Sequence, residues 1–371
     1  MEIGKNFSNF TKSISHYVRS VDLILYATAV AISIFGILNI YGVAGAESIF
    51  VKKQILFVLI GVSAMVIISF FNYRYLKNYS FPVLIVYLAA LFLLIITIVS
   101  PPVRGIHAWI VIGGFTFEPS ELIKLALIVL LAKYFSQRHI HIHQFKHIVI
   151  SGIYCAIPAL IIFRQPDLGS AAIIILIWFS ILMAAGISKK HFFILVLVAL
   201  IASYGVWSFV LKPYQQDRIL SFINPYSDPA GTGYNIIQSK IAIGSGGWFG
   251  RGLGKGSQAT LGFLPEAHND FAFSAVAEQF GFVSIFILLG LVFILLSRIF
   301  LIGERAYNNF GKLFALGMGL FIFFHIFISA AVNSGLMPIT GIPFSLLSYG
   351  GSHIISVMIG LGILQSIKRH G

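Results

Sequence analysis

The sequence predicts an all-α integral membrane protein. The chain of 371 residues is 58% hydrophobic and only 10% charged, and its mean hydropathy is +0.93. A water-soluble fold of this length requires a more polar exterior. Apolar runs also follow one another at the length of about 20 residues that a helix needs to cross the hydrocarbon of a bilayer. Because short gaps separate most of these runs, we expect a single polytopic domain over residues 1–371.

The apolar runs give ten expected transmembrane helices. The fourth carries Lys124, and the fifth is short for a span. The polar N-terminal segment, 1–21, has no apolar core followed by a small-residue cleavage site, so the first span is expected to act as the insertion signal. The ten ranges, in chain order, are 22–43, 54–72, 79–99, 120–137, 148–163, 169–187, 191–211, 271–297, 311–332 and 343–367.

The Lys and Arg residues predict the orientation of these spans. The net charge is +13, and most basic residues lie in the N-terminal segment, the even-numbered loops and the C-terminus. Under the positive-inside rule both termini are then cytoplasmic, and the odd-numbered loops face outward. The acidic residues show the opposite bias, since Glu121, Asp167, Glu266 and Asp270 all fall in outer loops or at outer helix ends. We therefore expect the polar chemistry on the extracytoplasmic side.

One long extracytoplasmic loop, 212–270, joins the seventh and eighth expected spans. It contains Gly-rich pieces such as GSGGWFGRGLGKG and amphipathic pieces such as YNIIQSKIAI, which includes Lys240. Long structured loops in compact proteins are commonly functional. The loop ends in FLPEAHND, which gathers Glu266, His268 and Asp270 at the start of the eighth span. Basic side chains near a carboxylate fit a phosphorylated lipid substrate, although a solvated loop can carry the same residues.

Two shorter outer clusters contain paired charges. In FEPSELIKLAL, Glu121 and Lys124 are three residues apart and share one face of the fourth span. They form either a local ion pair or a functional site, and a lysine inside a span favours the second interpretation. In FRQPDLGSA, Arg164 and Asp167 precede the sixth span. Asp167 either caps that helix or contributes, with Arg164, to an anion-binding helix start.

The outer end of the last helical hairpin is rich in Gly and Pro. The stretch NSGLMPITGIPFSLLSYGGS, residues 333–352, contains Ser348 and interrupts the two final spans. It is either an ordinary turn or broken backbone that lines a cavity at membrane depth.

Several other classes of function are excluded by missing motifs. Cys155 is the single cysteine, so neither an internal disulfide nor a Cys-rich metal site can form. The histidine-rich stretch RHIHIHQFKH, 138–147, has no carboxylate or cysteine to complete a metal site and is interpreted as a basic cytoplasmic loop. Walker motifs, dinucleotide fingerprints and basic stripes with interleaved aromatics are also missing. We therefore expect no nucleotide cofactor, no redox cofactor and no nucleic acid partner.

Five stretches together resemble the SEDS family (shape, elongation, division and sporulation proteins). They are EPSELIK, RQPDLGS, QSKIAIGSGG, FLPEAHNDF and PITGIPFSLLSYGGS, and they occur in the order typical of that family. The resemblance covers about residues 20–368. Two of the stretches, read as GYNIIQSKIAIGSGG and RQPDLGSA, are more similar to the RodA branch of the family than to the FtsW branch, which is the division paralogue.

The resemblance implies a peptidoglycan glycosyltransferase of the bacterial cytoplasmic membrane. SEDS proteins polymerise lipid II on the outer face of that membrane, in the RodA branch during cell elongation. They work with a class B penicillin-binding protein, which is a transpeptidase, and with other membrane proteins of the elongation complex. The family fold has ten transmembrane helices with both ends inside. The essential family aspartate corresponds to Asp270 of this chain.

This reaction suggests roles for the charged residues. A sugar hydroxyl needs a base before it attacks, and we predict that Asp270 is that base. Undecaprenyl pyrophosphate leaves, and Lys, Arg or a divalent cation such as Mg or Mn can stabilise its charge. One base opposite a leaving group implies a single displacement with inversion. The candidate substrate-binding residues are Arg104, Glu121, Lys124, Arg164, Asp167, Lys240, Glu266, His268 and Ser348, and no metal ligands are assigned.

Two other functions fit the same sequence. A lipid II flippase also needs a cavity, broken helices and cations, but polar clusters on one face argue against a carrier, which needs access from both sides. A non-catalytic scaffold that activates a partner enzyme would not need an intact acidic motif surrounded by cations. We therefore favour an enzyme.

Overall fold

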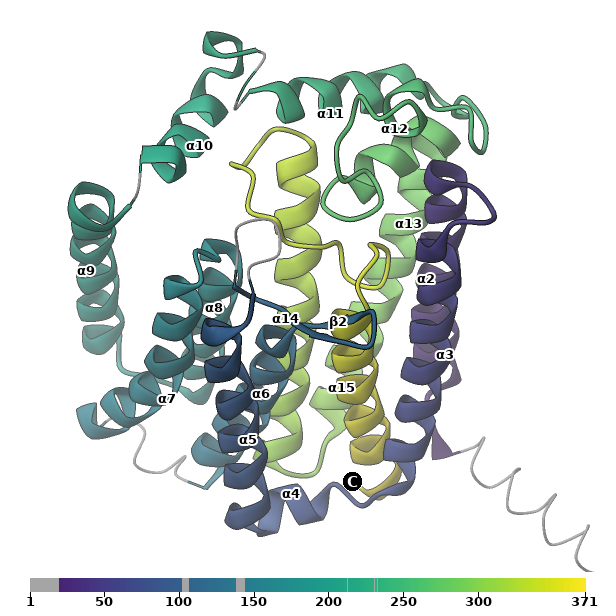
Figure 1. The fold of residues 1–371 in the computed structure, drawn as a ribbon. Coiled ribbons are helices and arrows are strands. Elements are labelled where there is room, and N and C mark those ends of the chain that lie inside the picture. The colour runs from purple at the N-terminus through teal and green to yellow at the C-terminus, as the bar shows by residue number, and fades with distance from the viewer. Residues whose placement is uncertain (1–19, 102–106, 138–143, 212, 230, 232) are drawn as a thin grey trace, which may run out of the picture.

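The computed structural model describes residues 20–101, 107–137, 144–211, 213–229, 231 and 233–371. Helices make up most of these residues (Figure 1), as the sequence predicts. The strands β1 (Ile110–Ile112) and β2 (Phe115–Phe117) pair antiparallel in one hairpin. The helices are α2 (Leu23–Ala44), α3 (Ile49–Phe70), α4 (Arg74–Asn78), α5 (Ser80–Val99), α6 (Pro119–Ser136), α7 (Phe145–Arg164), α8 (Leu168–Ala185), α9 (Lys189–Gly205) with the π-helix η1 (Val206–Val210), α10 (Pro213–Ile223), the 3-10 helix η2 (Pro225–Ser227), α11 (Tyr234–Ser245), α12 (Ser257–Thr260), α13 (Ala272–Arg305), α14 (Asn309–Asn333) and α15 (Gly351–His370).

Nine helices in the described ranges are long and apolar enough to cross a membrane. The fourth expected span, α6, is not among them because its 18 residues include Glu121, Lys124 and Lys133. It nevertheless stands inside the bundle, where it packs against α5, α8, α14 and α15 (Figure 1). With α6, the described helices account for the ten expected spans. The chain is thus an all-α, multi-pass integral membrane protein.

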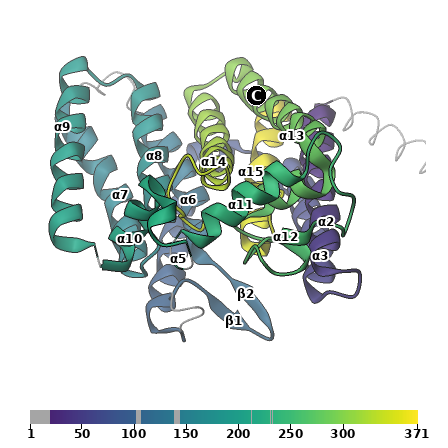
Figure 2. The same cartoon turned by 90° about the horizontal axis from the view of Figure 1, so that it is seen from above.

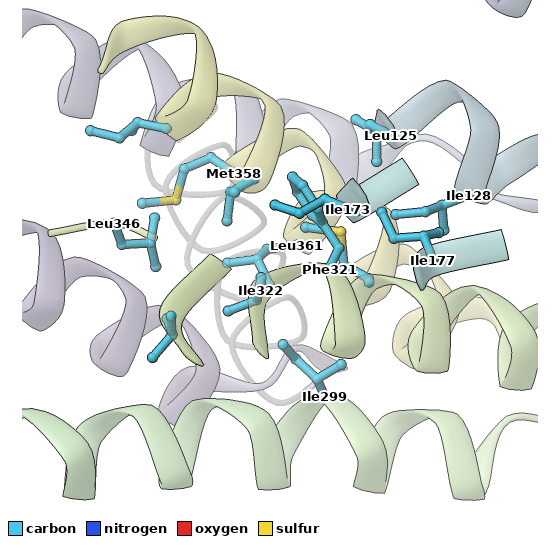
Figure 3. Close-up of a cluster of buried hydrophobic side chains, with 14 of the residues drawn as sticks. Leu125, Ile128, Ile173, Ile177, Ile299, Phe321, Ile322, Leu346, Met358 and Leu361 are labelled. Carbon is cyan, nitrogen blue, oxygen red and sulfur yellow. The ribbon is translucent and has the colours of Figure 1, made fainter. Parts of the chain in front are cut away.

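The bundle has a buried centre and a loosely attached edge. Near the centre, α6 is buried along almost its whole length, whereas α9 has no buried residue and stands apart beside α7 and α8 (Figure 2). Apolar side chains from several helices meet in the core (Figure 3). They include Leu125 and Ile128 of α6, Ile173 and Ile177 of α8, Phe321 and Ile322 of α14, and Met358 and Leu361 of α15.

The eighth span is longer than expected and is broken. It was predicted over 271–297, but α13 continues to Arg305 and has non-helical backbone at Gly281, with φ 77° and ψ −176°. Part of the long loop fills the break, since the Phe282 N–H donates to the Gly247 carbonyl at 2.9 Å. A Cβ on Gly281 would lie 2.2 Å from the Gly250 nitrogen, so position 281 accepts only glycine.

The tenth span begins later than expected. Helix α15 starts at Gly351 and not at 343, and residues 334–350 are not helical. This stretch, called here the re-entrant segment, turns back into the bundle. A Cβ on Gly36 of α2 would lie 2.3 Å from the Leu347 carbonyl oxygen. Gly36 lies about 12 Å along the helix axis from the end of α2 at Ala44. The prediction of a helix over 343–350 is therefore wrong, because this backbone is bonded to other elements.

The two ends of the bundle differ. One end, the loop face, carries α10, α11, α12 and the entrance of the re-entrant segment; the other, the C-terminal face, carries α4 and Gly371 (Figure 1). The start of α2 also lies at the C-terminal face, because Lys368 of α15 donates from Nζ to the Val21 carbonyl at 3.0 Å. The described chain thus begins and ends on one face, as an even number of spans requires.

Asp22 joins three helices at the C-terminal face. Its carboxylate caps α2 by accepting from the Leu25 N–H at 3.1 Å. It also accepts from Arg298 Nε of α13 at 3.0 Å and from Lys368 Nζ of α15 at 3.3 Å. Burial by itself would raise the pKa of Asp22, but the hydrogen bond from Arg298, the cap and the two positive charges lower this pKa below its ordinary value of 3.8. The stability that the ionised Asp22 carboxylate contributes is therefore fully present above pH 3.8. It is lost as the pH falls through the lower pKa of Asp22 in the folded state.

We expect Asp22→Asn to lower the stability of the detergent-solubilised protein by about 2 kcal/mol at pH 7, because Arg298 and Lys368 lose their shared counter-charge. The difference from wild type should narrow as the pH falls below 3.8, where the unfolded state takes up a proton, and should be lost once the pH passes the lower pKa of the native carboxylate. Thermal unfolding measures both effects. The matched control is Glu47→Gln, which removes the exposed pair between Glu47 and Lys52 and should leave the melting temperature unchanged. Equal losses in the two variants would contradict this role of Asp22.

Candidate active site

Asp270 lies at the loop face, immediately before α13, and is partly buried. The turn that presents it begins at Glu266, whose φ of 53° is unusual for a residue other than glycine and whose carbonyl accepts from the Asn269 N–H at 2.9 Å. The Asp270 carboxylate faces the re-entrant segment. A Cβ on Gly341 would lie 3.9 Å from its Oδ2, so the glycine leaves space beside the carboxylate.

A buried network fixes the backbone of Asp270. Asn333, the last residue of α14, donates from Nδ2 to the Asp270 carbonyl at 2.8 Å. Its Oδ1 accepts from the N–H and the hydroxyl of Ser274, at 3.0 and 2.8 Å. Its carbonyl accepts from the Ser239 hydroxyl at 2.7 Å. The side chains of Asn333, Ser274 and Ser239 are fully buried, so α11, α13 and α14 are tied together beside the carboxylate.

Ser348 and His268 join the site to the re-entrant segment. The Ser348 hydroxyl donates to the Asn269 carbonyl at 2.7 Å, and the Tyr349 N–H donates to the His268 carbonyl at 2.9 Å. The His268 ring lies 4.5 Å from the Phe50 ring, centroid to centroid. In this structure both residues hold the backbone around Asp270. That they also contact substrate stays a prediction.

Glu121 and Lys124 form a buried ion pair inside the bundle, with Lys124 Nζ 2.7 Å from Glu121 Oε1. Lys124 Nζ also lies 3.3 Å from His325 Nε2 of α14 and 3.4 Å from the Ser170 hydroxyl of α8. The other Glu121 oxygen lies 2.8 Å from His353 Nδ1 of α15. Of the two interpretations that the sequence left open, the ion pair is thus present, and the favoured functional role stays a prediction. Because both side chains are almost inaccessible, their contact with substrate stays a prediction.

The same cluster is the one group of three potential metal ligands among the residues that the structure describes. The ligand atoms of Glu121, His325 and His353 lie within 4.8 Å of one another. However, the Lys124 ammonium contacts both Glu121 and His325, so a positive charge already lies between these ligands. A second cation there would be repelled, and the donor set does not fit a resident metal ion.

Lys240 lies on the exposed side of α11, close to the end of α14. A Cβ on Gly335 would lie 2.2 Å from Lys240 Cε and 2.8 Å from its Nζ, so the lysine crosses over the backbone of the re-entrant segment. Its neighbour Ser239 bonds to Asn333, which in turn holds Asp270. Lys240 and Asp270 are therefore anchored to the same residue.

Arg164 and Asp167 lie on the other side of the re-entrant segment. Arg164 ends α7 and is exposed, and the Asp167 carboxylate caps α8 by accepting from the Ser170 N–H at 3.0 Å, which confirms the predicted cap. A Cβ on Gly169 would lie 2.8 Å from the Thr340 carbonyl oxygen. The start of α8 thus contacts the re-entrant segment at Thr340, next to Gly341, which faces Asp270.

Glu118, which precedes α6, is a partly buried carboxyl group that the sequence did not single out. Its N–H donates to the Ser352 hydroxyl at 2.8 Å, and its Oε1 accepts from the Ser120 hydroxyl at 2.6 Å. Burial, reinforced by the neighbouring Glu121 charge, raises the pKa of Glu118 to about 7. A carboxyl group with a raised pKa therefore lies at the start of α6, beside the start of α15.

Several residues that matter here were missed from the sequence, and Arg104 lies outside the described residues. Asn333, His325 and His353 each bond to elements far away in the chain. Asn333 begins the Gly- and Pro-rich stretch 333–352, so its position in the sequence could have marked it as a candidate functional residue. The two histidines lie inside apolar spans, and polar residues at such positions are commonly functional.

Comparisons with known proteins agree with the fold and the motifs. The FtsW, RodA and SpoVE family of cell cycle proteins matches residues 16–371. The peptidoglycan glycosyltransferase MrdB of Escherichia coli K12 is 35% identical over 343 residues, which cover 92% of this chain and 91% of the relative. A probable peptidoglycan glycosyltransferase FtsW of Trichlorobacter lovleyi is 34% identical over 360 residues, with coverage of 94% and 93%.

Two solved structures are also similar. A chain from a study of how a peptidoglycan synthase complex coordinates polymerization and crosslinking has a TM-score of 0.81 at 30% identity, with coverage of 94% of this chain and 98% of that chain. The rod shape determining protein RodA of Thermus thermophilus has a TM-score of 0.70 at 27% identity, with coverage of 94% and 97%. The resemblance found in the sequence motifs is confirmed, and this chain belongs to the FtsW, RodA and SpoVE family of cell cycle proteins.

Proposed function

We propose that this protein is a peptidoglycan glycosyltransferase that polymerises lipid II at its loop face, on the outer side of the bacterial cytoplasmic membrane. The observation that carries the proposal is the partly buried Asp270, whose backbone is held at a helix start by Asn333 and whose carboxylate faces Gly341. The names of the relatives, MrdB and FtsW, support the class of activity. The similarity to RodA supports a role in cell elongation, while the FtsW relatives keep division as the alternative.

In the proposed reaction Asp270 acts as general base. It takes the proton from the 4-hydroxyl of one lipid-linked disaccharide as that oxygen attacks the anomeric carbon of the growing chain. The bond from this carbon to undecaprenyl pyrophosphate breaks, and the pyrophosphate leaves with the electron pair. Because a single base acts opposite the leaving group, the configuration at the anomeric carbon is inverted.

The location of Asp270 suits a substrate with a polar head and a lipid tail. The carboxylate lies at the start of α13, whose further turns present exposed apolar residues such as Phe286 and Phe293. A substrate can therefore keep its tail in lipid while its sugar reaches the carboxylate. Lys240 and Arg164 are both exposed, on either side of the re-entrant segment, and can attract the pyrophosphate.

A divalent cation, Mg or Mn, belongs to the proposal as a companion of the pyrophosphate. The buried Glu121 cluster does not fit it, because Lys124 occupies that position. Mg²⁺ in such sites is commonly held by one or two carboxylates together with substrate phosphates. Such an ion would supply charge to the leaving group, and Glu266 and Asp270 are the two carboxylates at the end of the long loop that could hold it.

We further propose that a class B penicillin-binding protein is the partner, alongside other membrane proteins of the elongation complex. Support comes from the similar chain in the peptidoglycan synthase complex. Polymerisation and crosslinking by one assembly would deliver each new glycan directly to a transpeptidase.

Replacing Asp270 by Asn should lower polymerisation about 10²- to 10⁴-fold, since the base is lost while the backbone bond to Asn333 remains. Purified protein, lipid II, a divalent cation and the transpeptidase are incubated, and glycan strands are separated by gel. Asp217→Asn, at an exposed position of α10 in the same loop, is the matched control and should retain full activity. Near-normal strands from Asp270→Asn would remove Asp270 as the base. If wild type makes no polymer even with the partner, lipid II flipping in vesicles becomes the better explanation.

Replacing Lys240 by Met should lower kcat/KM for lipid II about tenfold or more, because one cation for the pyrophosphate is lost. Steady-state polymerisation rates measure the effect. Lys255→Met serves as the control, since Lys255 is exposed in the same long loop. Equal losses for both variants would indicate a general effect of surface charge.

A membrane-anchored class B penicillin-binding protein should copurify with this protein and increase its polymerisation rate. Affinity purification from the native membrane, followed by the glycan assay with and without the purified partner, measures both. Full activity of the isolated protein, unchanged on addition of the partner, would show that the partner is dispensable for the chemistry.

A further inference from the structure

Two buried histidines that the proposed reaction does not use lie between the ion pair and the re-entrant segment. His353 contacts Glu121 Oε2 with Nδ1 at 2.8 Å and the Ser345 hydroxyl with Nε2 at 2.9 Å. His325 lies 3.3 Å from Lys124 Nζ through Nε2 and 3.3 Å from the Pro343 carbonyl through Nδ1. The two rings are in contact, with centroids 4.3 Å apart.

The partners of each ring determine its tautomer. A carboxylate accepts hydrogen bonds, so Nδ1 of His353 carries the proton and Nε2 accepts from the Ser345 hydroxyl. An ammonium group donates, so Nε2 of His325 accepts from Lys124 and Nδ1–H donates to the Pro343 carbonyl. Both rings are thus fully used, with one nitrogen toward the ion pair and the other toward the re-entrant segment.

The re-entrant segment is strained where the histidines hold it. Leu346 follows Ser345 and has φ 65°, a conformation that is unfavourable for a leucine, although its side chain is almost completely buried. Such a residue stays in place only when its surroundings determine its conformation. On the far side of the segment, the Leu347 carbonyl presses against α2 at Gly36. The segment is therefore held between α2 and the histidines.

The strained part of the segment is connected to Asp270. The Phe344 N–H donates to the Ser348 hydroxyl at 2.9 Å, and that hydroxyl donates to the Asn269 carbonyl at 2.7 Å. The Phe344 ring also stacks on Phe273 of α13, with centroids 6.0 Å apart. Only one peptide bond separates Asn269 from Asp270. Phe344 and Ser348 thus connect Ser345 to the backbone immediately before Asp270.

We propose that His353, assisted by His325, is a positioning residue that holds the proposed base Asp270 in register through the re-entrant segment. In this arrangement the Glu121–Lys124 pair acts at a distance, as the fixed support of the two rings. The inference rests on the proposed function for its kinetic consequence, whereas its structural consequence, a segment held by Ser345, does not depend on activity.

Three variants test the proposal. His353→Asn keeps an amide near the Nδ1 position, facing Glu121, but does not reach Ser345; His353→Gln reaches the Nε2 position and retains that contact. Ser345→Ala removes the hydroxyl with little change in volume, so it remains informative if a His353 variant fails to fold. The matched control is His191→Asn at the C-terminal face, where His191 Nδ1 contacts the Ser188 hydroxyl at 2.9 Å.

The expected kinetic result is a kcat reduced about tenfold to a hundredfold in His353→Asn and Ser345→Ala, with a KM for lipid II changed less than about threefold. His353→Gln should recover much of the loss, and His191→Asn should behave as wild type. His353→Asn and Ser345→Ala break the same hydrogen bond, between His353 and Ser345. The double variant should therefore be no slower than either single variant.

Amide hydrogen exchange provides a readout without catalysis. Exchange over 263–270 and 338–350 should accelerate in His353→Asn and Ser345→Ala but not in His191→Asn. Unchanged exchange and kcat in both variants, or additive losses in the double variant, would overturn the proposal. If wild type is inactive but exchange is altered in the variants, the proposed function is contradicted. The coupling of Ser345 to the re-entrant segment is then still supported.

Discussion

The structure depends on one constraint: non-helical backbone inside the bundle must find hydrogen-bond partners away from water. The re-entrant segment meets it with backbone bonds, with its own Ser348 hydroxyl and with side chains from other helices. Gln54 of α3 donates to the Ser348 carbonyl, His325 donates to the Pro343 carbonyl, and the Ser348 hydroxyl accepts from the Phe344 N–H. This explains why polar residues lie inside otherwise apolar spans. Without the segment, Gln54 and His325 would each have an unsatisfied donor in the bundle interior.

The buried ion pair has its own energetic requirement. A carboxylate and an ammonium lose several kcal/mol each when they leave water, and their attraction compensates only when further hydrogen bonds are made. Glu121 and Lys124 meet this condition through His353, His325 and Ser170, which come from three different helices. The pair therefore makes the relative placement of α6, α8, α14 and α15 specific, although apolar packing alone could hold such helices together in several registers.

Local features were predictable from the sequence, and contacts between distant residues were not. Hydropathy located the spans, the spacing of Glu121 and Lys124 predicted their pairing, and Asp167 was recognisable as a cap. By contrast, His353 and Glu121 are separated by 232 residues, and no periodicity along the chain relates them. The tenth span was also drawn from 343, although 333–352 had been interpreted as a turn or as broken backbone, so a helix was wrongly predicted over 343–350. What prevents a helix there is tertiary: the close approach of Gly36 leaves no room for another helical turn.

The break in α13 at Gly281 has a consequence for how the protein is made. The N–H groups of Phe282 and Val283 donate to the carbonyls of Gly247 and Trp248, which belong to the long loop. While the eighth span enters the bilayer, these N–H groups lack their final acceptors until the loop arrives. The helix and the loop must therefore reach their final state together. The corner at Gly281 is therefore complete only once the loop residues Gly247 and Trp248 have docked against α13.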